Sequence, residues 1–396
     1  MRVAILTDAL ALRREGVMLR RVAIGLVDEG ASVVSIEPRS VSGVTARSIG
    51  GGLIPHLIYE DRGLWLTRVL RCDRLRRDLF AAGGAPDVVH VLGRRAWRFG
   101  LEIARRSGSA LCVDVHTRGG LHRLHGFENV ASATFGAESE RLDATDAEPG
   151  RGAAADRRPS FAAVAADRIV AVEAAEALRR TPVHTVPWGV HRRGEWRERR
   201  SERTRPAIAV LAEFGKPDLL RGVLAGLAEL SGEPMIFVDE EASADGRMWK
   251  LAGELGIRDR VDVAPSLEAH RELTLQCDVL VAPGPTGRHR SVVLDAMAAG
   301  VAVVGRRDPL VEALHRSGVA WLLEGDEPAS WASALREALE GGEAARDKVA
   351  TAKRFVDEER RPSQHIEGLL TVYRSLANPQ AIRFQTANAP SAADSP

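Results

Sequence analysis

Short apolar runs alternate with amphipathic segments along most of the chain. Residues 3–7 form a β-branched apolar run, a helical pattern follows over about residues 16–29, and residues 31–36 form a second apolar run. This order of strand, helix, glycine and strand is typical of the βαβ unit of a parallel sheet. It recurs in the first half, where we expect strands at residues 87–92, 110–116, 168–172 and 183–187 and helices at residues 94–107 and 173–180.

A second alternating region begins at Ala207. Its apolar runs predict strands at residues 207–212, 234–239, 260–263, 277–283, 301–305 and 319–323, with helical patterns between them. The last long helical patterns cover residues 328–339, 342–355 and 363–376. We therefore predict an α/β protein with two tandem Rossmann-like, doubly wound parallel-sheet domains. Ligands of such domains bind at the carboxyl ends of the strands, so we expect a cleft between the two.

The alternation fails in three segments, and these set the predicted boundaries. The first domain covers residues 1–187, and its residues 129–160, poor in large apolar side chains, predict a poorly ordered insertion. Residues 188–206 form a basic linker; we interpret its charges as solvated, and contact with a polyanion is the alternative. The second domain covers residues 207–376, and residues 377–396 form a tail that we expect to be disordered.

Composition narrows the class of protein. The chain has 396 residues, of which 45% are apolar, enough for two cores. A net charge of +1 does not favour nucleic acid as a partner. Cys72, Cys112 and Cys277 lack paired spacing, which indicates a reducing, cytoplasmic location without disulfide bonds. No apolar stretch reaches the ~18 residues of a membrane span, and the first residues do not read as a signal peptide. Peripheral contact with a membrane stays open.

Several segments resemble one known family. They are PDVVHVLG and VDVH in the first half, ADRIVAVEAAEALRR and VHTVPWGV at its end, and GIRDRVDVAPSLEAHRELTLQCDVLVAP and VVLDAMAAGVAVVG in the second half. These segments resemble retaining glycosyltransferases of the GT-B fold, the group 1 or family 4-like enzymes. The resemblance runs in order from about residue 1 to residue 376 and is more specific in the second half. Trp188 stands where that family has an asparagine.

The resemblance implies a site for a nucleotide diphosphate sugar in the second domain. After the strand at residues 277–283, the loop GPTGRHR leads into a helix from Ser291. Glycine backbone, a helix N-terminus and basic side chains can together hold a diphosphate. An ordinary turn with solvated basic residues is the alternative. By the resemblance, Asp295 would hold the ribose. The donor-binding candidates are Lys216, Gly284, Arg288, Arg290, Ser291, Asp295 and Glu312.

Two departures from the family pattern bear on catalysis. Gly287 stands where the family has a glutamate near the transferred sugar, and Glu213 stands where it has an arginine that neutralises the leaving diphosphate. Lys216 is the nearest substitute for that arginine. Removing one group that stabilises the developing charge costs on the order of 100-fold or more in rate.

His116 is the catalytic candidate of the first domain. It ends the expected strand at residues 110–116, where the family often has a histidine that faces the sugar. As a hydrogen-bond donor it could steady the sugar or the leaving oxygen; a histidine bonded to backbone at a strand end is the alternative. His122 and His125 lack acidic or cysteine partners at ligand spacing, so we expect no metal.

The sequence thus predicts a hexosyltransferase that moves a sugar from a nucleotide diphosphate sugar to an acceptor with retention of configuration. The first alternative is an inactive binding or regulatory protein on the same scaffold, which Gly287 and Glu213 favour. The second is a nucleotide-sugar epimerase, although no convincing acid and base pair stands out. No cofactor is expected besides the donor substrate. A dinucleotide oxidoreductase is disfavoured because no G-x-G-x-x-G follows the first strand.

Overall fold

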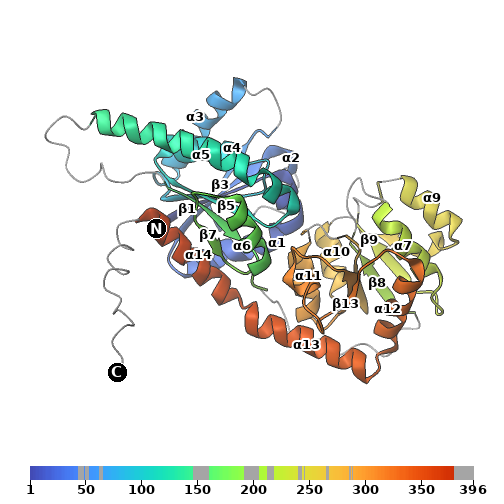
Figure 1. The fold of residues 1–396 in the computed structure, drawn as a ribbon. Helices are drawn as coiled ribbons and strands as arrows, with labels where there is room; N and C mark the ends of the chain where they lie inside the picture. Colours follow the sequence, from blue (N-terminus) through green and yellow to red (C-terminus); the bar gives the residue numbers. More distant parts are fainter. Residues whose placement is uncertain are drawn as a thin grey trace, which may run out of the picture.

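The computed structural model contains two parallel β-sheets, each covered by helices (Figure 1). It describes residues 1–42, 49, 53–61, 66–145, 160–190, 205–211, 218–239, 243–244, 246–264, 267–284, 287 and 289–378. The prediction of two parallel-sheet α/β domains is confirmed.

The first sheet has the strand order β3-β2-β1-β4-β5-β6-β7, and all its neighbours are parallel. The order reverses between β1 and β4, which is where an open parallel sheet forms a crevice at its carboxyl edge. The strands are β1 (Arg2–Thr7), β2 (Ser32–Pro38), β3 (His56–Tyr59), β4 (Val88–Leu92), β5 (Ala110–Val115), β6 (Phe161–Ala165) and β7 (Val183–Thr185). The helices are α1 (Ala9–Asp28), α2 (Arg39–Ser42), α3 (Leu66–Ala81), α4 (Trp97–Ser107), α5 (Arg118–Thr145) and α6 (Arg168–Ala177).

The second sheet has the order β10-β9-β8-β11-β12-β13 and is also parallel throughout. Its strands are β8 (Ala207–Val210), β9 (Met235–Val238), β10 (Val261–Val263), β11 (Val279–Ala282), β12 (Ala302–Arg306) and β13 (Trp321–Leu323). The helices of this half are α7 (Asp218–Ala228), α9 (Gly246–Glu254), α10 (Leu267–Thr274), α11 (Arg290–Ala298), α12 (Pro328–Glu340), α13 (Glu343–Glu359) and α14 (Pro362–Ala377). Two 3-10 turns cover Arg258–Arg260 and Glu312–Leu314.

The side chains of β1 alternate between the two faces of the first sheet, and both faces are buried. Val3 and Ile5 belong to an apolar cluster that contains residues of α1 and α14, and this cluster continues into α11 and α13. Ala4 and Leu6 point to the opposite face and join a cluster with residues of α4, α5 and α6. Successive side chains of a strand alternate between faces, so a strand covered on both sides is apolar throughout.

Helix α14 returns to the first domain, although the sequence pattern assigns it to the second. It packs against α1, β4 and β5, and Figure 1 shows α13 and α14 passing from one domain to the other. Tyr373 is fully buried there, and its hydroxyl lies 2.6 Å from Nδ1 of His90. The apolar residues Leu369 and Leu370 are buried with it. The chain therefore crosses between the domains twice.

The local predictions need three corrections. Residues 168–172, expected as a strand, begin helix α6, because Asp167 precedes them and its carbonyl accepts the N–H of Ala171 at 3.0 Å; the strand is β6, just upstream. Helix α1 begins at Ala9 and not near Gly16, because Oδ1 of Asp8 accepts the N–H of Ala11 at 2.8 Å. Helix α5 extends to Thr145 through part of the expected insertion.

The rest of the expected insertion from residue 146, the basic stretch at residues 191–204 and the tail from residue 379 lie outside the described residues.

Candidate functional site

The carboxyl edge of the first sheet carries an open pocket of about 50 Å³. It lies where the sheet order reverses, among the ends of β1, β4 and β5, and the N-termini of α1 and α5 adjoin it. Its polar lining comes from Asp8, Arg14, Glu15, Arg94, Arg95, Asp114, His116 and Thr117. Asp8 is engaged with backbone here, because it caps α1 and its Oδ2 accepts the N–H of Arg95 at 3.1 Å.

The N-terminus of α11 faces this edge from the second domain. Gly284 follows β11, Gly287 has φ +71°, and His289 stands at the N-cap with φ 59°. The N–H of Gly287 donates to Oδ2 of Asp308 at 2.7 Å, and the other oxygen of Asp308 accepts from Leu310 at 2.9 Å. The predicted glycine-containing loop is therefore tied to the segment after β12.

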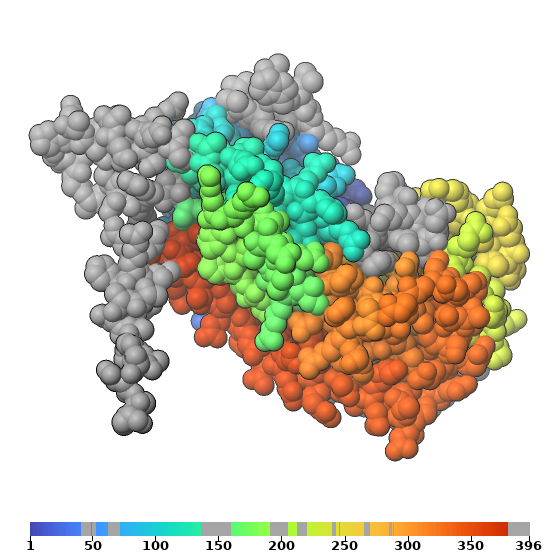
Figure 2. All heavy atoms as spheres, in the orientation of Figure 1, coloured from blue at the N-terminus to red at the C-terminus, as the bar shows by residue number. Residues whose placement is uncertain are grey.

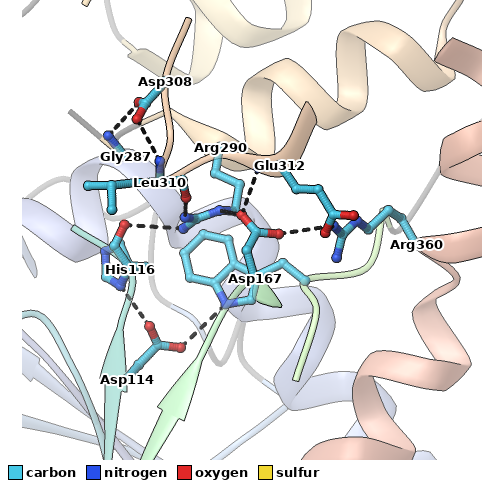
Figure 3. Close-up of polar contacts among 10 residues, drawn as sticks. Asp114, His116, Asp167, Gly287, Arg290, Asp308, Leu310, Glu312 and Arg360 are labelled. Atoms are coloured by element: carbon cyan, nitrogen blue, oxygen red, sulfur yellow. Dashed lines mark hydrogen bonds and ion pairs between the residues drawn. The ribbon is translucent and has the colours of Figure 1, made fainter. Parts of the chain in front are cut away.

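Arg290, predicted to bind phosphate, is 1% exposed and bridges the two domains (Figure 3). Its Nε donates to Oδ2 of Asp167 at 2.7 Å, and Nη1 donates to the carbonyl of His116 at 3.3 Å. Nη2 donates to the carbonyl of Leu310. The guanidinium also lies 5.2 Å from the ring centroid of Trp188. In the space-filling view, the green surface around α6 meets the orange surface of the second domain at this interface (Figure 2).

Asp167 joins a second arginine to the same network. Oδ1 of Asp167 lies 3.0 Å from Nη2 of Arg360, which also donates to Oε2 of Glu312 at 2.6 Å. The N–H of Glu312 donates to Oδ2 of Asp167 at 3.3 Å. Glu312, predicted to contact the donor, thus neutralises Arg360 in this arrangement.

Ser291 and Asp295 face helix α1. The hydroxyl of Ser291 donates to Oε2 of Glu15 and accepts from Nη1 of Arg271 at 3.0 Å. Oδ2 of Asp295 accepts from Nε and Nη2 of Arg271 at 2.8 and 2.5 Å, and Nη1 of Arg21 lies 3.9 Å away. Burial raises the pKa of Glu15, and the charges of Arg271, His116 and Arg290 and the Ser291 hydrogen bond offset this only in part. A carboxyl group of the chain therefore occupies the N-terminus of α11, where an anion binds well.

The two domains approach each other so closely at position 287 that only a glycine fits there. A Cβ atom at this position would lie 2.6 Å from the carbonyl oxygen of His116 and 3.2 Å from Cβ of Leu310. Backbone that close leaves no room for the glutamate of the family pattern. The departure at Gly287 thus goes together with the contact between the two domains.

The ring of His116 is hydrogen-bonded to a side chain and not to the backbone. Its Nδ1 lies 2.7 Å from Oδ1 of Asp114, and Trp188 packs beside it with the ring centroids 5.0 Å apart. Trp188 is 1% exposed, so it offers no face for a sugar in this arrangement.

The structure brings together His116, Arg290, Ser291, Asp295 and Glu312 at the domain interface, with Gly284 in the loop before α11. Lys216, Arg288 and the departure at Glu213 lie outside the described residues. The donor-binding roles stay predictions.

Sequence reasoning missed Asp114, Asp167, Glu15 and Arg271. For Asp114 a signal exists, because Asp-x-His at a strand end places both side chains on one face. The partners of Asp167 and Glu15 are 123 and 276 residues away, and no local pattern marks such pairs.

The described residues hold neither a cluster of metal ligands nor a membrane-spanning helix. Within those ranges, no three His, Cys, Asp or Glu side chains gather closely enough to hold a metal ion. None of the helices found there is long and apolar enough to cross a lipid bilayer.

Solved structures resemble the chain over nearly its whole length. HepE of Anabaena in complex with UDP-glucose has a TM-score of 0.69 at 14% identity, covering 94% of this chain and 100% of that one. Sucrose-phosphate synthase of Thermosynechococcus elongatus has a TM-score of 0.69 at 11% identity, covering 96% and 100%. A glycosyltransferase of Rickettsia africae has a TM-score of 0.66 at 12% identity, covering 95% and 98%.

The fold is GT-B. Within this GT-B chain, the family model described as glycosyl transferases group 1 matches residues 238–341, which contain β11, α11 and β12 of the second domain. No curated protein sequence matches significantly. The sequence match therefore falls on the half that carries most of the predicted donor residues.

Proposed function

We propose that this chain is a glycosyltransferase that transfers a sugar from a nucleotide diphosphate sugar to an acceptor with retention of configuration. The observation that carries the proposal is the group 1 match over residues 238–341, which include the loop and helix of the predicted donor site. The GT-B neighbours add support, since HepE of Anabaena was solved with UDP-glucose.

In this proposal the diphosphate binds at the loop after Gly284 and at the N-terminus of α11. Backbone N–H groups and the helix dipole favour an anion at such a site. Departure of the nucleoside diphosphate builds negative charge there, and Arg290, with Lys216 and Arg288 as predicted contributors, would stabilise it. The acceptor binds at the pocket of the first domain, and the transferred sugar lies between the acceptor and the diphosphate, beside His116. No metal takes part.

Donor binding requires rearrangement at the interface. The hydroxyl of Ser291 is bonded to Glu15, Asp295 faces Arg271, and Arg290 pairs with Asp167. For a diphosphate to reach the N-terminus of α11, helix α1 has to withdraw Glu15 from Ser291. Relative motion of two domains about a ligand is a common way to do this.

The second candidate is a binding or regulatory protein without turnover. The observation that favours it is that Arg290 and Arg271 are already neutralised by carboxylates of the chain. A site whose cations are paired internally offers a diphosphate little net charge.

The test combines binding and turnover. Calorimetric titration with UDP-glucose, UDP-N-acetylglucosamine, GDP-mannose, ADP-glucose and the free diphosphates measures binding, and release of nucleoside diphosphate measures turnover. We expect one donor to bind and turn over in the presence of EDTA, and NMR of the product to show the donor's anomeric configuration. Asp295→Asn should weaken binding about tenfold or more, since a hydrogen bond to a charged group contributes about 1.5–3 kcal/mol.

Glu128→Gln is the matched control, because Glu128 is also a buried carboxylate and accepts backbone N–H groups of Arg179, Arg180 and Thr181 far from α11. Binding without turnover selects the second candidate. Absence of binding by every nucleotide rejects both donor-dependent functions.

A further inference from the structure

Asp114 and His116 form a side-chain pair at the end of β5. Residues two apart in a strand point to the same face, so the carboxylate lies beside the imidazole. Oδ1 of Asp114 is 2.7 Å from Nδ1 of His116, and Oδ2 accepts the indole N–H of Trp188 at 3.3 Å (Figure 3). Asp114 is 3% exposed, so this geometry is held inside the protein.

The carboxylate of Asp114 is ionised at neutral pH. Burial raises its pKa, but the hydrogen bond with His116 and the charges of His116, His90 and Arg290 outweigh burial, and the net shift is downward. An ionised carboxylate has no proton to donate, so Nδ1 of His116 carries the proton of their hydrogen bond. In the neutral imidazole, Nε2 then carries the lone pair.

His116 is also part of the pocket. It lines the pocket together with Thr117 and Gly120, and 11% of the His116 side chain is exposed. Among the described residues, Nε2 of His116 makes no hydrogen bond. Trp188 packs beside the imidazole in a tilted arrangement with the ring centroids 5.0 Å apart, and the carbonyl of His116 accepts a hydrogen bond from Arg290. The backbone and Nδ1 are fixed, and the nitrogen that remains is the one that can reach a ligand.

We propose that Asp114 is a positioning residue that fixes His116 as the Nδ1–H tautomer, so that Nε2 accepts a hydrogen bond from a hydroxyl of the transferred sugar. This inference rests on the proposed function for its substrate. It reverses the role expected from the sequence, in which His116 donates to the sugar or to the leaving oxygen. The tautomer also sets specificity, because a sugar without that hydroxyl leaves Nε2 unpaired.

The first test needs no turnover. Long-range ¹H–¹⁵N NMR of the full chain, with His116→Gln to assign the signal, reports which ring nitrogen of His116 carries the proton. We expect the Nδ1–H tautomer in the wild type, and a shift toward Nε2–H in Asp114→Asn, whose amide can donate to Nδ1. An Nε2–H tautomer in the wild type overturns the inference even if the protein is an active transferase.

The second test measures release of UDP from UDP-glucose, or from whichever donor in the panel above turns over. We expect Asp114→Asn to lower kcat about 10–100-fold, the size of effect seen when the partner that orients a metal-bound histidine is removed, with KM for the donor little changed. His116→Gln/Asp114→Asn should be no slower than His116→Gln alone.

Trp188→Phe is the matched control. It removes the other hydrogen bond of Asp114 and keeps the contact between Asp114 and His116. If Asp114 only accepts the indole N–H of Trp188, both variants lose stability alike, and neither changes the tautomer of His116. That result contradicts the positioning role. If no donor turns over, the proposed function fails, and the NMR result still decides the tautomer.

Discussion

The two sides of the domain interface differ in how their polar groups are used. On the first domain, the carboxyl edge of the sheet keeps an open pocket beside His116, whose Nδ1 is held by Asp114. On the second domain, the N-terminus of α11 is covered by α1, and its Ser291 and Arg290 are bonded to Glu15 and Asp167. The side with the weaker sequence resemblance is open, and the side with the more specific resemblance is occupied by the chain itself.

This difference gives the motif departure at Gly287 a physical meaning. A glycine fits at this position because the loop touches the backbone of His116. Asp308 holds that loop through the N–H of Gly287 at 2.7 Å. The departure fits a closed interface, and the comparison between the two sides can be tested by opening it.

Arg290→Ala should have the largest effect on stability. It leaves Asp167 buried with one arginine fewer and two carbonyls without their donor, and breaking a buried ion pair costs about 3–5 kcal/mol. Denaturant unfolding measures the loss. Arg307→Ala is the control, since its ion pair with Glu324 has side chains 35% and 75% exposed, and an exposed pair contributes less than about 1 kcal/mol. Equal losses in the two variants would mean that Arg290 does not join the domains.

Gly287→Ala should come next. The variant combines a positive φ with a Cβ placed 2.6 Å from the carbonyl oxygen of His116, and we expect a loss of about 2–4 kcal/mol. Gly318→Ala separates the two causes, because Gly318 has φ +84° with nothing within 4 Å of its added Cβ. The control should lose about 1 kcal/mol. If both lose the same amount, the loop does not press against the first domain.

Glu15→Gln should have the smallest effect, and one that depends on pH. The pKa of Glu15 is raised in the folded protein, so between its ordinary pKa and the raised value the folded state holds more protons than the unfolded state. The contribution of Glu15 to stability therefore falls as pH rises through that window. The variant lacks this loss, so denaturant unfolding should show it gaining stability relative to the wild type as the pH rises above the ordinary pKa of a glutamate.

The stability of Glu128→Gln should depend on pH in the opposite direction. Burial raises the pKa of Glu128. Hydrogen bonds from the backbone of Arg179, Arg180 and Thr181 lower this pKa by a larger amount, so the net shift is downward. Its contribution is present above the ordinary pKa and is lost as pH falls. This variant should lose stability relative to the wild type at pH 8 and recover in acid. A parallel response of both variants would rule out a Glu15 whose pKa is raised by burial.

The architecture followed from the sequence because apolar runs and glycine turns repeat locally. Whether a short apolar run forms a strand or a helix did not follow from the sequence. Residues 168–172 are rich in valine and isoleucine yet helical, while the alanine-rich residues 161–165 form β6. Burial between neighbouring strands, and the turn at Asp167, outweighed intrinsic preference there.

The candidate site was predictable only in part. His116 and the α11 loop were found from motifs, and Asp114 was within reach of the strand period. The partners of Arg290, Ser291 and Asp295 come from the residue before α6, from α1 and from α10. Pairing between domains depends on how they dock, which local patterns do not encode.

The return of α14 to the first sheet has a consequence for synthesis on the ribosome. β7 ends at Thr185, whereas α14, which covers β4 and β5, begins at Pro362. At about 5–20 residues per second, the apolar face under α14 waits on the order of ten seconds or more for its cover. Throughout that interval, the whole second domain is made while the first remains unfinished. The nascent first domain should therefore be a client of chaperones that shield apolar surface, and ribosome-bound chains stalled before residue 362 are where such binding should be strongest.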